Sequence, residues 1–483
     1  MSACLSRFLL LTTCLAPACG DDGDSSASAS ATMGVTTAPG TTTGGSGPTS
    51  TSDMSQGTGS GGATTTTGGG EEPTTGGPVS ASETGSTGTT TSGEIKLDVG
   101  AQVDFGVGDC DCGTASEFGY IWVANSPEST VSKIDTTTMQ EVGRYLTRAD
   151  GMGNPSRTSV SISGRAVAVA NRHQGLVKIW ANHEDCDPNK NGVPGLQTSS
   201  GKNDVLPWGQ DDCVAWYTDF PNFTTQRPVA WAPGIFNEAL CRWEHERVWT
   251  AGCGGGFSPG FGSGDPDVAL VDGDTGEILQ TVHLAGYGCN GFGPYGGAVD
   301  SKGNLWLTLN NGNLAFVDIE TFEYQIHPKP ANVASYGMTV DSLDRVWVTS
   351  YSQDVGVARY DPVTMTWSTI TEIKQYQQSG IAQGADGRIW VAGTFTNMGN
   401  LQGVAGIDPE TLQVTTYLKT TSQGKGVSVD GKGLVWRAGG SVASRVDPGT
   451  GTEDTYTGLN GAYTYSDMTG FGVANVTGCQ PAG

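Results

Sequence analysis

Short apolar runs centred on tryptophan recur along the chain from about residue 115 to about residue 475. Each run is a short, mainly apolar segment rich in Val, Ile, Leu and Trp, which is typical of a β-strand. The runs are IWVAN at 121–125, VAVAN at 167–171, VWTAG at 248–252, LWLTL at 305–309, VWVTS at 346–350, IWVAG at 389–393 and VWRAG at 435–439. Six have tryptophan at the second position, and the 167–171 copy has Ala168 there.

A second marker, Asp-x-x-Thr, follows most of these runs in phase. Its copies begin at Asp135, Asp272, Asp318, Asp361, Asp408 and Asp447. Aspartate at the first turn position accepts a backbone N–H, and proline after it presets φ, so the marker predicts a hairpin turn instead of a catalytic acid. A third turn precedes several tryptophan runs, at 300–304, 341–345 and 430–433.

Each unit therefore contains four strands in 40-odd residues, which is the spacing of a propeller blade. Seven copies predict an all-β fold, a seven-bladed β-propeller of four-stranded blades over residues 94–483. The oversized step from Ala168 to Trp249 predicts an insertion at about 181–212 in blade two. Blade one lacks an innermost strand, and the tail at 462–475 resembles that strand of other units. We expect the tail to close the ring, which hides sheet edges.

The N-terminus predicts export. Residues 1–18 contain one arginine and an apolar run too short to span a bilayer, as in a signal peptide. Residues 16–19 resemble a bacterial lipobox, which implies a lipid on Cys19 and favours the outer membrane or the cell surface; cleavage after Ala18 without lipid is the alternative. Residues 19–93 are Ser, Thr, Gly and Ala with almost no large apolar residue, so we expect a disordered tether.

Charge and cysteine content refine the picture. The formal net charge of −24 disfavours nucleic acid and leaves the lipid as the means of membrane attachment. We expect a monomer. Eight cysteines remain beyond Cys19, an even number that suggests disulfides in an oxidising compartment. Cys186 and Cys213 bracket the insertion and predict one bridge. Ring closure predicts a second, between Cys112 and Cys479.

The insertion also has metal-ligand spacing. Asp187, Asn189 and Asn191 alternate and a glycine follows, as at the start of a calcium loop, with the backbone carbonyl of Val193 as a further ligand. The position where such loops place glutamate is a threonine, Thr198, and Asp185 or Asp204 is the candidate substitute. The sequence predicts a structural Ca²⁺ here. A metal-free loop pinned by its disulfide is the alternative.

Two resemblances follow from the repeats. Residues 121–142 resemble the surface-protein repeat with a YVTN core. Residues 294–325 and 335–367 resemble blades of the virginiamycin B lyase family. That resemblance implies a metal-dependent elimination with a histidine base and a carboxylate partner. Blades of this family often carry glutamate three places after the tryptophan. In this chain those places hold Asn125, Asn171, Gly252, Leu309, Ser350, Gly393 and Gly439.

None of these residues is acidic or histidine, and the five histidines of the chain are scattered, so no catalytic residue is predicted. We expect an envelope-anchored, non-catalytic binding propeller whose ligand is an unknown small molecule, glycan or protein. Two alternatives remain. One is a metal-dependent lyase or lactonase acting in the central channel, and the other is a purely structural surface repeat protein.

Overall fold

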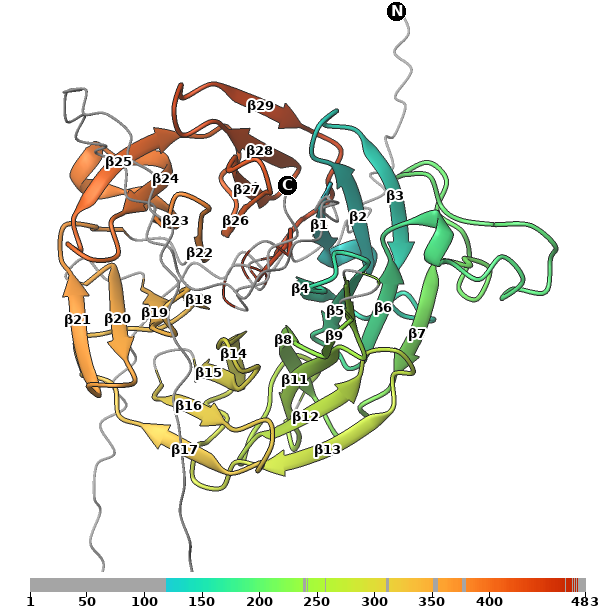
Figure 1. Cartoon of the computed structure of the whole chain (residues 1–483), viewed down its shortest axis with the longest axis horizontal. Helices are drawn as coiled ribbons and strands as arrows, with labels where there is room; N and C mark the ends of the chain where they lie inside the picture. The colour runs from blue at the N-terminus through green and yellow to red at the C-terminus, as the bar shows by residue number, and fades with distance from the viewer. Residues whose placement is uncertain are drawn as a thin grey trace, which may run out of the picture. The chain divides into compact units, whose positions relative to one another are not determined.

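The computed structural model describes residues 119–237, 240, 242–256, 258–309, 312–350, 355–375, 379–464, 466–470, 472, 474 and 476. Over these residues the chain forms a ring of antiparallel sheets around a central axis (Figure 1). The signal segment, the tether with Cys19, and the cysteines Cys112 and Cys479 lie outside the described residues. Within the described part, no helix has the length and apolar character needed to cross a membrane.

The sheets follow one another along the chain, and each blade begins with its innermost strand except blade one. Blade one has β1 (Tyr120–Asn125), β2 (Thr130–Asp135) and β3 (Glu141–Leu146). Blade two has β4 (Pro155–Val160), β5 (Ala166–Asn171), β6 (Leu176–Trp180) and β7 (Val214–Thr218). Blade three has β8 (Thr225–Ala232), β11 (Arg247–Cys253), β12 (Asp267–Asp272) and β13 (Ile278–His283). A separate hairpin of β9 (Ile235–Asn237) and β10 (Arg242–Glu244) lies between β8 and β11 in sequence.

The remaining four blades are regular. Blade four has β14 (Pro294–Val299), β15 (Leu305–Leu309), β16 (Leu314–Val317) and β17 (Tyr324–His327). Blade five has β18 (Met338–Val340), β19 (Val346–Thr349), β20 (Val357–Asp361) and β21 (Thr366–Ile370). Blade six has β22 (Ile381–Gln383), β23 (Ile389–Phe395), β24 (Leu401–Ile407) and β25 (Val414–Lys419). Blade seven has β26 (Gly426–Val429), β27 (Val435–Gly439), β28 (Val442–Val446) and β29 (Glu453–Tyr456). Three short 3₁₀ helices are η1 (Ser126–Glu128), η2 (His183–Asp185) and η3 (Thr396–Met398).

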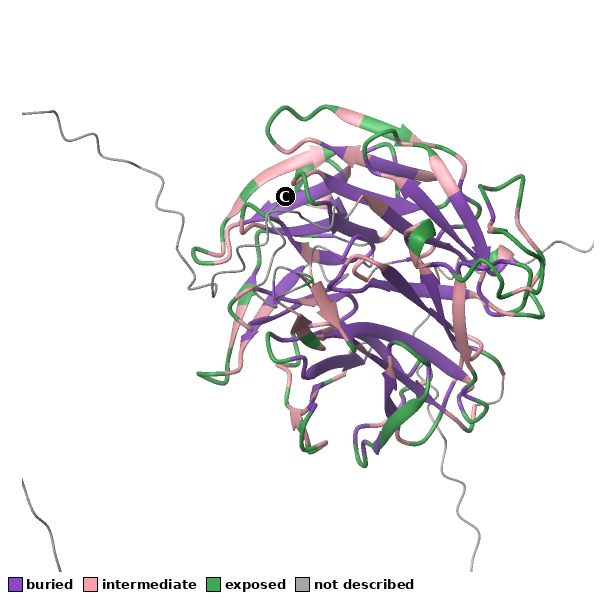
Figure 2. Ribbon diagram, turned by 45° about the vertical axis from the view of Figure 1, so that its right-hand side comes forward, coloured by how far each residue is buried: buried purple, intermediate pink, exposed green. Residues whose placement is uncertain are grey.

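The repeated tryptophans form the core between blades. Every one of them is almost fully buried in the second strand of its blade, and Figure 2 shows burial concentrated in the inner strands. Blade two has Ala168 at that position, and Trp231 of β8 packs in the same apolar cluster. Trp231 is 1% exposed and its indole N–H donates to the Ser159 carbonyl at 2.9 Å. A tryptophan from the next blade therefore supplies the aromatic volume that blade two lacks.

The Asp-x-x-Thr markers form the turns between the third and fourth strands of their blades. In the turn between β2 and β3, Asp135 Oδ1 accepts the backbone N–H groups of Thr137 and Thr138 at 2.9 and 2.7 Å. Asp272, Asp318, Asp361, Asp408 and Asp447 make the same two contacts in their own turns. These aspartates are turn-forming residues, as the spacing predicts.

A basic residue in the third strand links several blades to the next one. Each of these side chains lies against buried aromatic rings and donates to a backbone carbonyl near the outer turn of the following blade. The pairs are Lys133 with Ala181, Lys178 with Gly273, Arg359 with Pro409 and Arg445 with Thr136. The Arg445 contact joins blade seven to blade one. The sequence repeat does not reveal these links. Their acceptors are backbone carbonyls, which every residue type has, so no particular side chain marks the acceptor position.

The C-terminal segment supplies the innermost strand position of blade one. Ala462 bridges both Asn125 and Gly440, the Tyr463 N–H donates to the Ala124 carbonyl at 3.1 Å, and the Trp122 N–H donates to the Met468 carbonyl at 2.9 Å. Leu459, Ala462 and Met468 pack in one cluster with residues of β1 and β27. The first and last blades are therefore joined side by side, and the predicted ring closure is present.

Candidate functional site

Antiparallel connectivity divides the connections between two faces of the ring. The links between blades and the turns from second to third strands lie on one face, called here the loop face; the Asp turns lie on the other. The loop face contains a cavity of about 710 Å³. Its walls come from blades one, two and three. The lining residues are Ser126 and Pro127 after β1, Arg148, Asp150, Gly151, Met152 and Asn154 before β4, His173 and Gln174 after β5, Phe223 and Thr224 before β8, and Gly256, Ser258 and Pro259 after β11.

His173 lines this cavity, and its contacts determine which ring nitrogen carries the proton. Its Nδ1 lies 3.0 Å from the Met152 carbonyl, and because a carbonyl only accepts, the neutral ring carries its proton on Nδ1. Burial lowers the pKa of His173, and the positive charges of Arg172, Arg148 and Arg227 lower it further, while the Met152 contact opposes this. The ring is therefore neutral at physiological pH and presents Nε2 as a hydrogen-bond acceptor.

Three tyrosines from distant blades meet near the central axis at the same face. Tyr295 is the second residue of β14. Tyr336 lies two residues before β18, and Tyr463 lies in the C-terminal segment that closes the ring. The Tyr295 hydroxyl lies 3.2 Å from that of Tyr336 and 3.0 Å from that of Tyr463, and the Tyr336 and Tyr463 hydroxyls also bond. Tyr336 is fully buried and Tyr295 nearly so, whereas Tyr463 keeps part of its surface. Blades one, four and five are thus tied together by one phenol network.

Cationic side chains surround these rings. Arg157 of β4 and Arg227 of β8 lie 5.1 and 5.0 Å from the Tyr295 ring, Arg172 lies 4.2 Å from the Tyr463 ring, and Lys425 Nζ lies 5.1 Å from it. We call these four cations and the three tyrosines the central cluster. Such contacts are favourable between a cation and an aromatic face. In a chain of net charge −24 this is a local concentration of positive charge.

The positive charge around Tyr463 changes the pKa of its hydroxyl group. Burial alone would raise the pKa of Tyr463, but Arg172 and Arg157, together with hydrogen bonds from Tyr295 and Tyr336, outweigh it and lower the pKa. The phenolate form is therefore favoured relative to a free tyrosine. The site stabilises negative charge at this oxygen.

Two loops beside the cluster are joined by a disulfide that the sequence analysis missed. Cys253 and Cys289 are bonded, with their Cα atoms 6.2 Å apart. The loops carry Phe261 and Phe292, whose rings lie 5.1 Å apart. Gly262 is required here, because a Cβ at that position would lie 2.4 Å from Cys253 Cβ. The two glycine-rich stretches of the sequence thus serve close loop packing, and the paired cysteines were the available signal.

The predicted calcium residues make separate local contacts in the structure. Asp185 forms an ion pair with Arg165, and Asp187 Oδ1 accepts the Asn189 backbone N–H at 3.0 Å. Asn191 Nδ2 donates to the Gln210 carbonyl at 2.9 Å, and its Oδ1 accepts the Val193 backbone N–H at 2.7 Å. Among the described residues, no group of three or more His, Cys, Asp or Glu side chains is placed to hold a metal.

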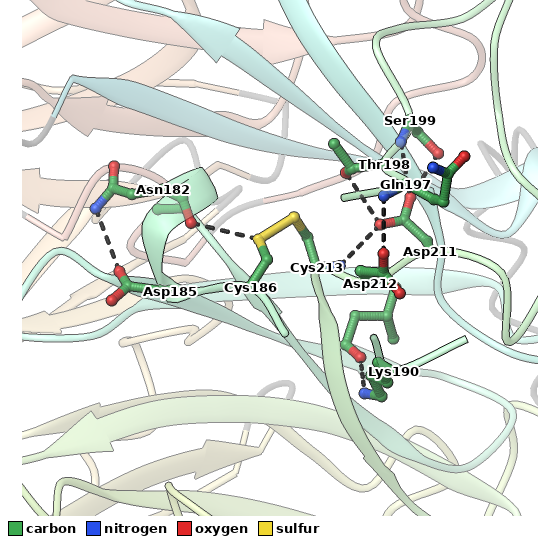
Figure 3. The surroundings of a disulfide bond; sticks show 12 residues. Asn182, Asp185, Cys186, Lys190, Gln197, Thr198, Ser199, Asp211, Asp212 and Cys213 are labelled. Carbon is green, nitrogen blue, oxygen red and sulfur yellow. Dashed lines mark hydrogen bonds between the residues drawn. A yellow bond between two sulfur atoms is a disulfide. The ribbon is translucent and has the colours of Figure 1, made fainter. Parts of the chain in front are cut away.

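Two aspartates next to Cys213 organise the insertion (Figure 3). Asp211 accepts hydrogen bonds from Thr198, Ser199 and the Cys213 backbone N–H at 2.7–3.0 Å. Asp212 accepts the backbone N–H groups of Asn191 and Gln197 at 3.1 and 2.7 Å. A disulfide joins Cys186 to Cys213 with an S–S length of 2.05 Å, the pair that brackets the insertion in the sequence. Sequence reasoning did not single out Asp211 and Asp212, because an acidic residue that caps a distant loop has no local pattern.

The calcium loop stays a prediction with a direct test. If Ca²⁺ binds there, it will raise the melting temperature of the wild-type protein by mass action. Replacing Asp187 and Asn189 with alanine is then expected to abolish that rise. Differential scanning calorimetry with Ca²⁺ and with a chelator measures it, and the Lys202→Ala variant in the same insertion is the control. Melting temperatures that do not respond to Ca²⁺ would leave the loop without a metal role.

Two of the positions that carry glutamate in the lyase resemblance, Asn125 and Asn171, have structural roles in this chain. Asn125 is fully buried, donates to Ser132 at 2.8 Å and accepts the Asn460 backbone N–H at 3.0 Å. Asn171 is also fully buried and exchanges hydrogen bonds with Thr147 at 2.8 and 2.9 Å. Both hold neighbouring segments together and neither faces the cavity.

No family model and no curated protein matches this sequence. Solved structures do match in three dimensions. A virginiamycin B lyase from Staphylococcus aureus with quinupristin is 13% identical, with 68% of this chain and 87% of that chain covered and a TM-score of 0.41. A protein from Bacteroides uniformis, provisionally named a 6-phosphogluconolactonase, is 11% identical, with 71% and 97% covered and a TM-score of 0.46. AztD from Citrobacter koseri is 10% identical, with 71% and 96% covered and a TM-score of 0.43.

The chain is a seven-bladed β-propeller. That statement rests on its own strands and their pairing. The similar structures have different names, and at these identities they carry no argument about what this chain binds or does. The two disulfides among the described residues fit a protein that folds in an oxidising compartment.

Proposed function

We propose that this chain is a binding propeller of the cell envelope, held by lipid on Cys19, that takes a small molecule into the loop-face cavity. The observation that carries the proposal is the cavity itself, about 710 Å³ between three blades, which is the size of a small-molecule site. Arg148, His173 and Asn154 provide polar groups on its walls, while Phe223 and Met152 provide apolar surface. Because strand ends and short connections form these walls, the site is largely preformed.

Filling the cavity tests the proposal. Met152 lines it and is 65% exposed, so tryptophan at this position would occupy the space with little effect on the core. We expect members of a panel of sugars, sugar acids, amino acids and short peptides to raise the melting temperature of the wild-type protein. The Met152→Trp variant is expected to lose that response.

The matched control is Met398→Trp, in η3 on blade six, where the methionine is 47% exposed and lies outside the cavity walls. It should respond as the wild type does. Equal responses of the wild type and Met152→Trp, or no response of the wild type to any probe, would contradict the proposed site.

A lyase or lactonase is the second candidate, and His173 is the observation that favours it. A neutral imidazole with a free Nε2 beside a cavity has the properties of a general base. The described residues do not gather a set of acidic and histidine ligands for the metal of that reaction, so we derive no step through a metal. Turnover of a lactone by the wild type and its loss in the His173→Gln variant would establish this candidate over simple binding.

A further inference from the structure

Arg227 is a buried cation with unused hydrogen-bond donors. Its side chain is 5% exposed at the inner end of β8, beside the central cluster. Nη2 donates to the Gly260 carbonyl at 3.3 Å, whereas Nε and Nη1 have no acceptor among the described residues. No acidic side chain of the described part pairs with it either.

This arrangement is costly unless another group completes it. A guanidinium keeps its positive charge in proteins, and burying it with a single acceptor and no counter-charge is unfavourable. The adjacent rings of Phe292 and Tyr295, at 5.5 and 5.0 Å, compensate only in part, because an aromatic face accepts weakly. The missing group must therefore carry oxygen acceptors, and negative charge fits best.

The surroundings favour an anion over water. Arg157, Arg172 and Lys425 lie against the same tyrosine rings, which brings further positive charge close to Arg227. The charges of Arg172 and Arg157 also lower the pKa of Tyr463. An anion next to Arg227 is attracted by this charge, whereas a neutral water gains little.

Arg227 lies next to the loops that border the loop-face cavity. The Gly260 carbonyl that Arg227 contacts lies in the loop after β11, and Gly256, Ser258 and Pro259 of the same loop line the cavity. Phe292, in the second loop of the disulfide pair, is 37% exposed, and its ring lies 5.5 Å from the guanidinium. The buried guanidinium is therefore adjacent to the cavity wall.

We infer that the central cluster is a binding site for a small oxyanion, a carboxylate or phosphate group, which accepts hydrogen bonds from the free donors of Arg227. Two sources share this chemistry. The oxyanion is either a free ion or the charged end of the molecule in the loop-face cavity. The second case rests on the proposed function, and the first does not.

The test uses inorganic phosphate and acetate on the whole protein at constant ionic strength. We expect phosphate to raise the wild-type melting temperature by roughly 2–4 °C near saturation. The Arg227→Met variant is expected to lose this response. Phosphate also stabilises proteins in general through exclusion from their surface, so only the difference between the variant and the wild type counts.

Without added anion, Arg227→Met should melt at the same temperature as the wild type or higher, because the variant removes an uncompensated buried charge. The control is Arg359→Met, which removes a cation that has a carbonyl partner at 2.6 Å in a link between blades. That variant should melt lower and keep the full phosphate response. A lower melting temperature of Arg227→Met without anion, with an unchanged phosphate response, would overturn the inference. Arg227→Lys, which keeps the charge and should respond weakly to phosphate, serves if Arg227→Met does not fold.

The cavity variant separates the two sources. Met152→Trp should leave the response to inorganic phosphate intact, because that ion does not need the outer cavity. If a carboxylated sugar raises the melting temperature of the wild type but of neither Met152→Trp nor Arg227→Met, it occupies both the loop-face cavity and the central cluster. If the sugar response of Met152→Trp is unchanged while the phosphate response still depends on Arg227, the cavity proposal fails and the oxyanion site stands. If Arg227→Met keeps the phosphate response while Met152→Trp loses the sugar response, the oxyanion site fails and the cavity proposal stands.

Discussion

A chain that ends at Gly458 is expected to lose the folded ring. It would lack Leu459, Ala462 and Met468, which are buried against residues of β1 and β27. Burying these side chains contributes on the order of 5 kcal/mol, which is comparable with the whole net stability of many domains. The inner edge of β1 would also be exposed and available for intermolecular pairing. We expect aggregation or a molten product, detected by size-exclusion chromatography and by loss of the near-ultraviolet circular dichroism.

The control for this truncation is a chain that ends at Val476, which keeps every described residue of the closing segment. A synthetic peptide of residues 459–476 added during refolding of the shorter chain should restore part of the native signal. If the chain that ends at Gly458 instead melts cooperatively at the full-length temperature, the closing segment contributes little and the interpretation of ring closure is wrong.

The second large effect concerns Glu246, a carboxyl group buried next to β11. Burial raises its pKa to about 7, although hydrogen bonds from Ser163 and the charge of Lys178 oppose this. Because the folded state holds the proton more tightly than the unfolded state, folding takes up a proton between about pH 4.5 and about pH 7. The stability from this group is complete at low pH and is lost as the pH rises through 7. The loss corresponds to about 3 kcal/mol.

The Glu246→Gln variant is therefore expected to gain stability relative to the wild type as the pH rises from about 5 to about 8. Melting temperatures of both proteins across this range measure the difference. Glu244→Gln, two residues earlier and paired with Arg242, is the control and should show no such gain with pH. A constant difference between Glu246→Gln and the wild type over the whole range would mean that Glu246 is ionised in the folded protein.

The propeller was predictable because its signals are local. Residues equivalent to Trp347 and Asp361 recur in the same order in most repeats, and each of the two contacts neighbours in its own blade. The oversized step to Trp249 shows the insertion for the same reason. Ring closure was predictable too, since the tail resembles strands elsewhere in the chain.

The central cluster was not predictable, because its members share no pattern and come together only through the closed ring. Arg157, Arg227 and Tyr463 lie in blades two, three and one, and nothing near them in sequence indicates that they meet. The calcium loop illustrates the opposite case. Asp187 and Asn189 have suggestive spacing, yet their contacts in the structure are local turn contacts, and spacing alone does not determine whether a metal binds.

The central claim is that the loop face of this propeller is its binding surface. A crystal structure of the wild-type protein with the probe that stabilises it most tests this directly. We expect density for the probe in the cavity between blades one, two and three, with any carboxylate or phosphate group directed toward Arg227. Density on the opposite face, among the Asp turns or in the insertion, would contradict the account.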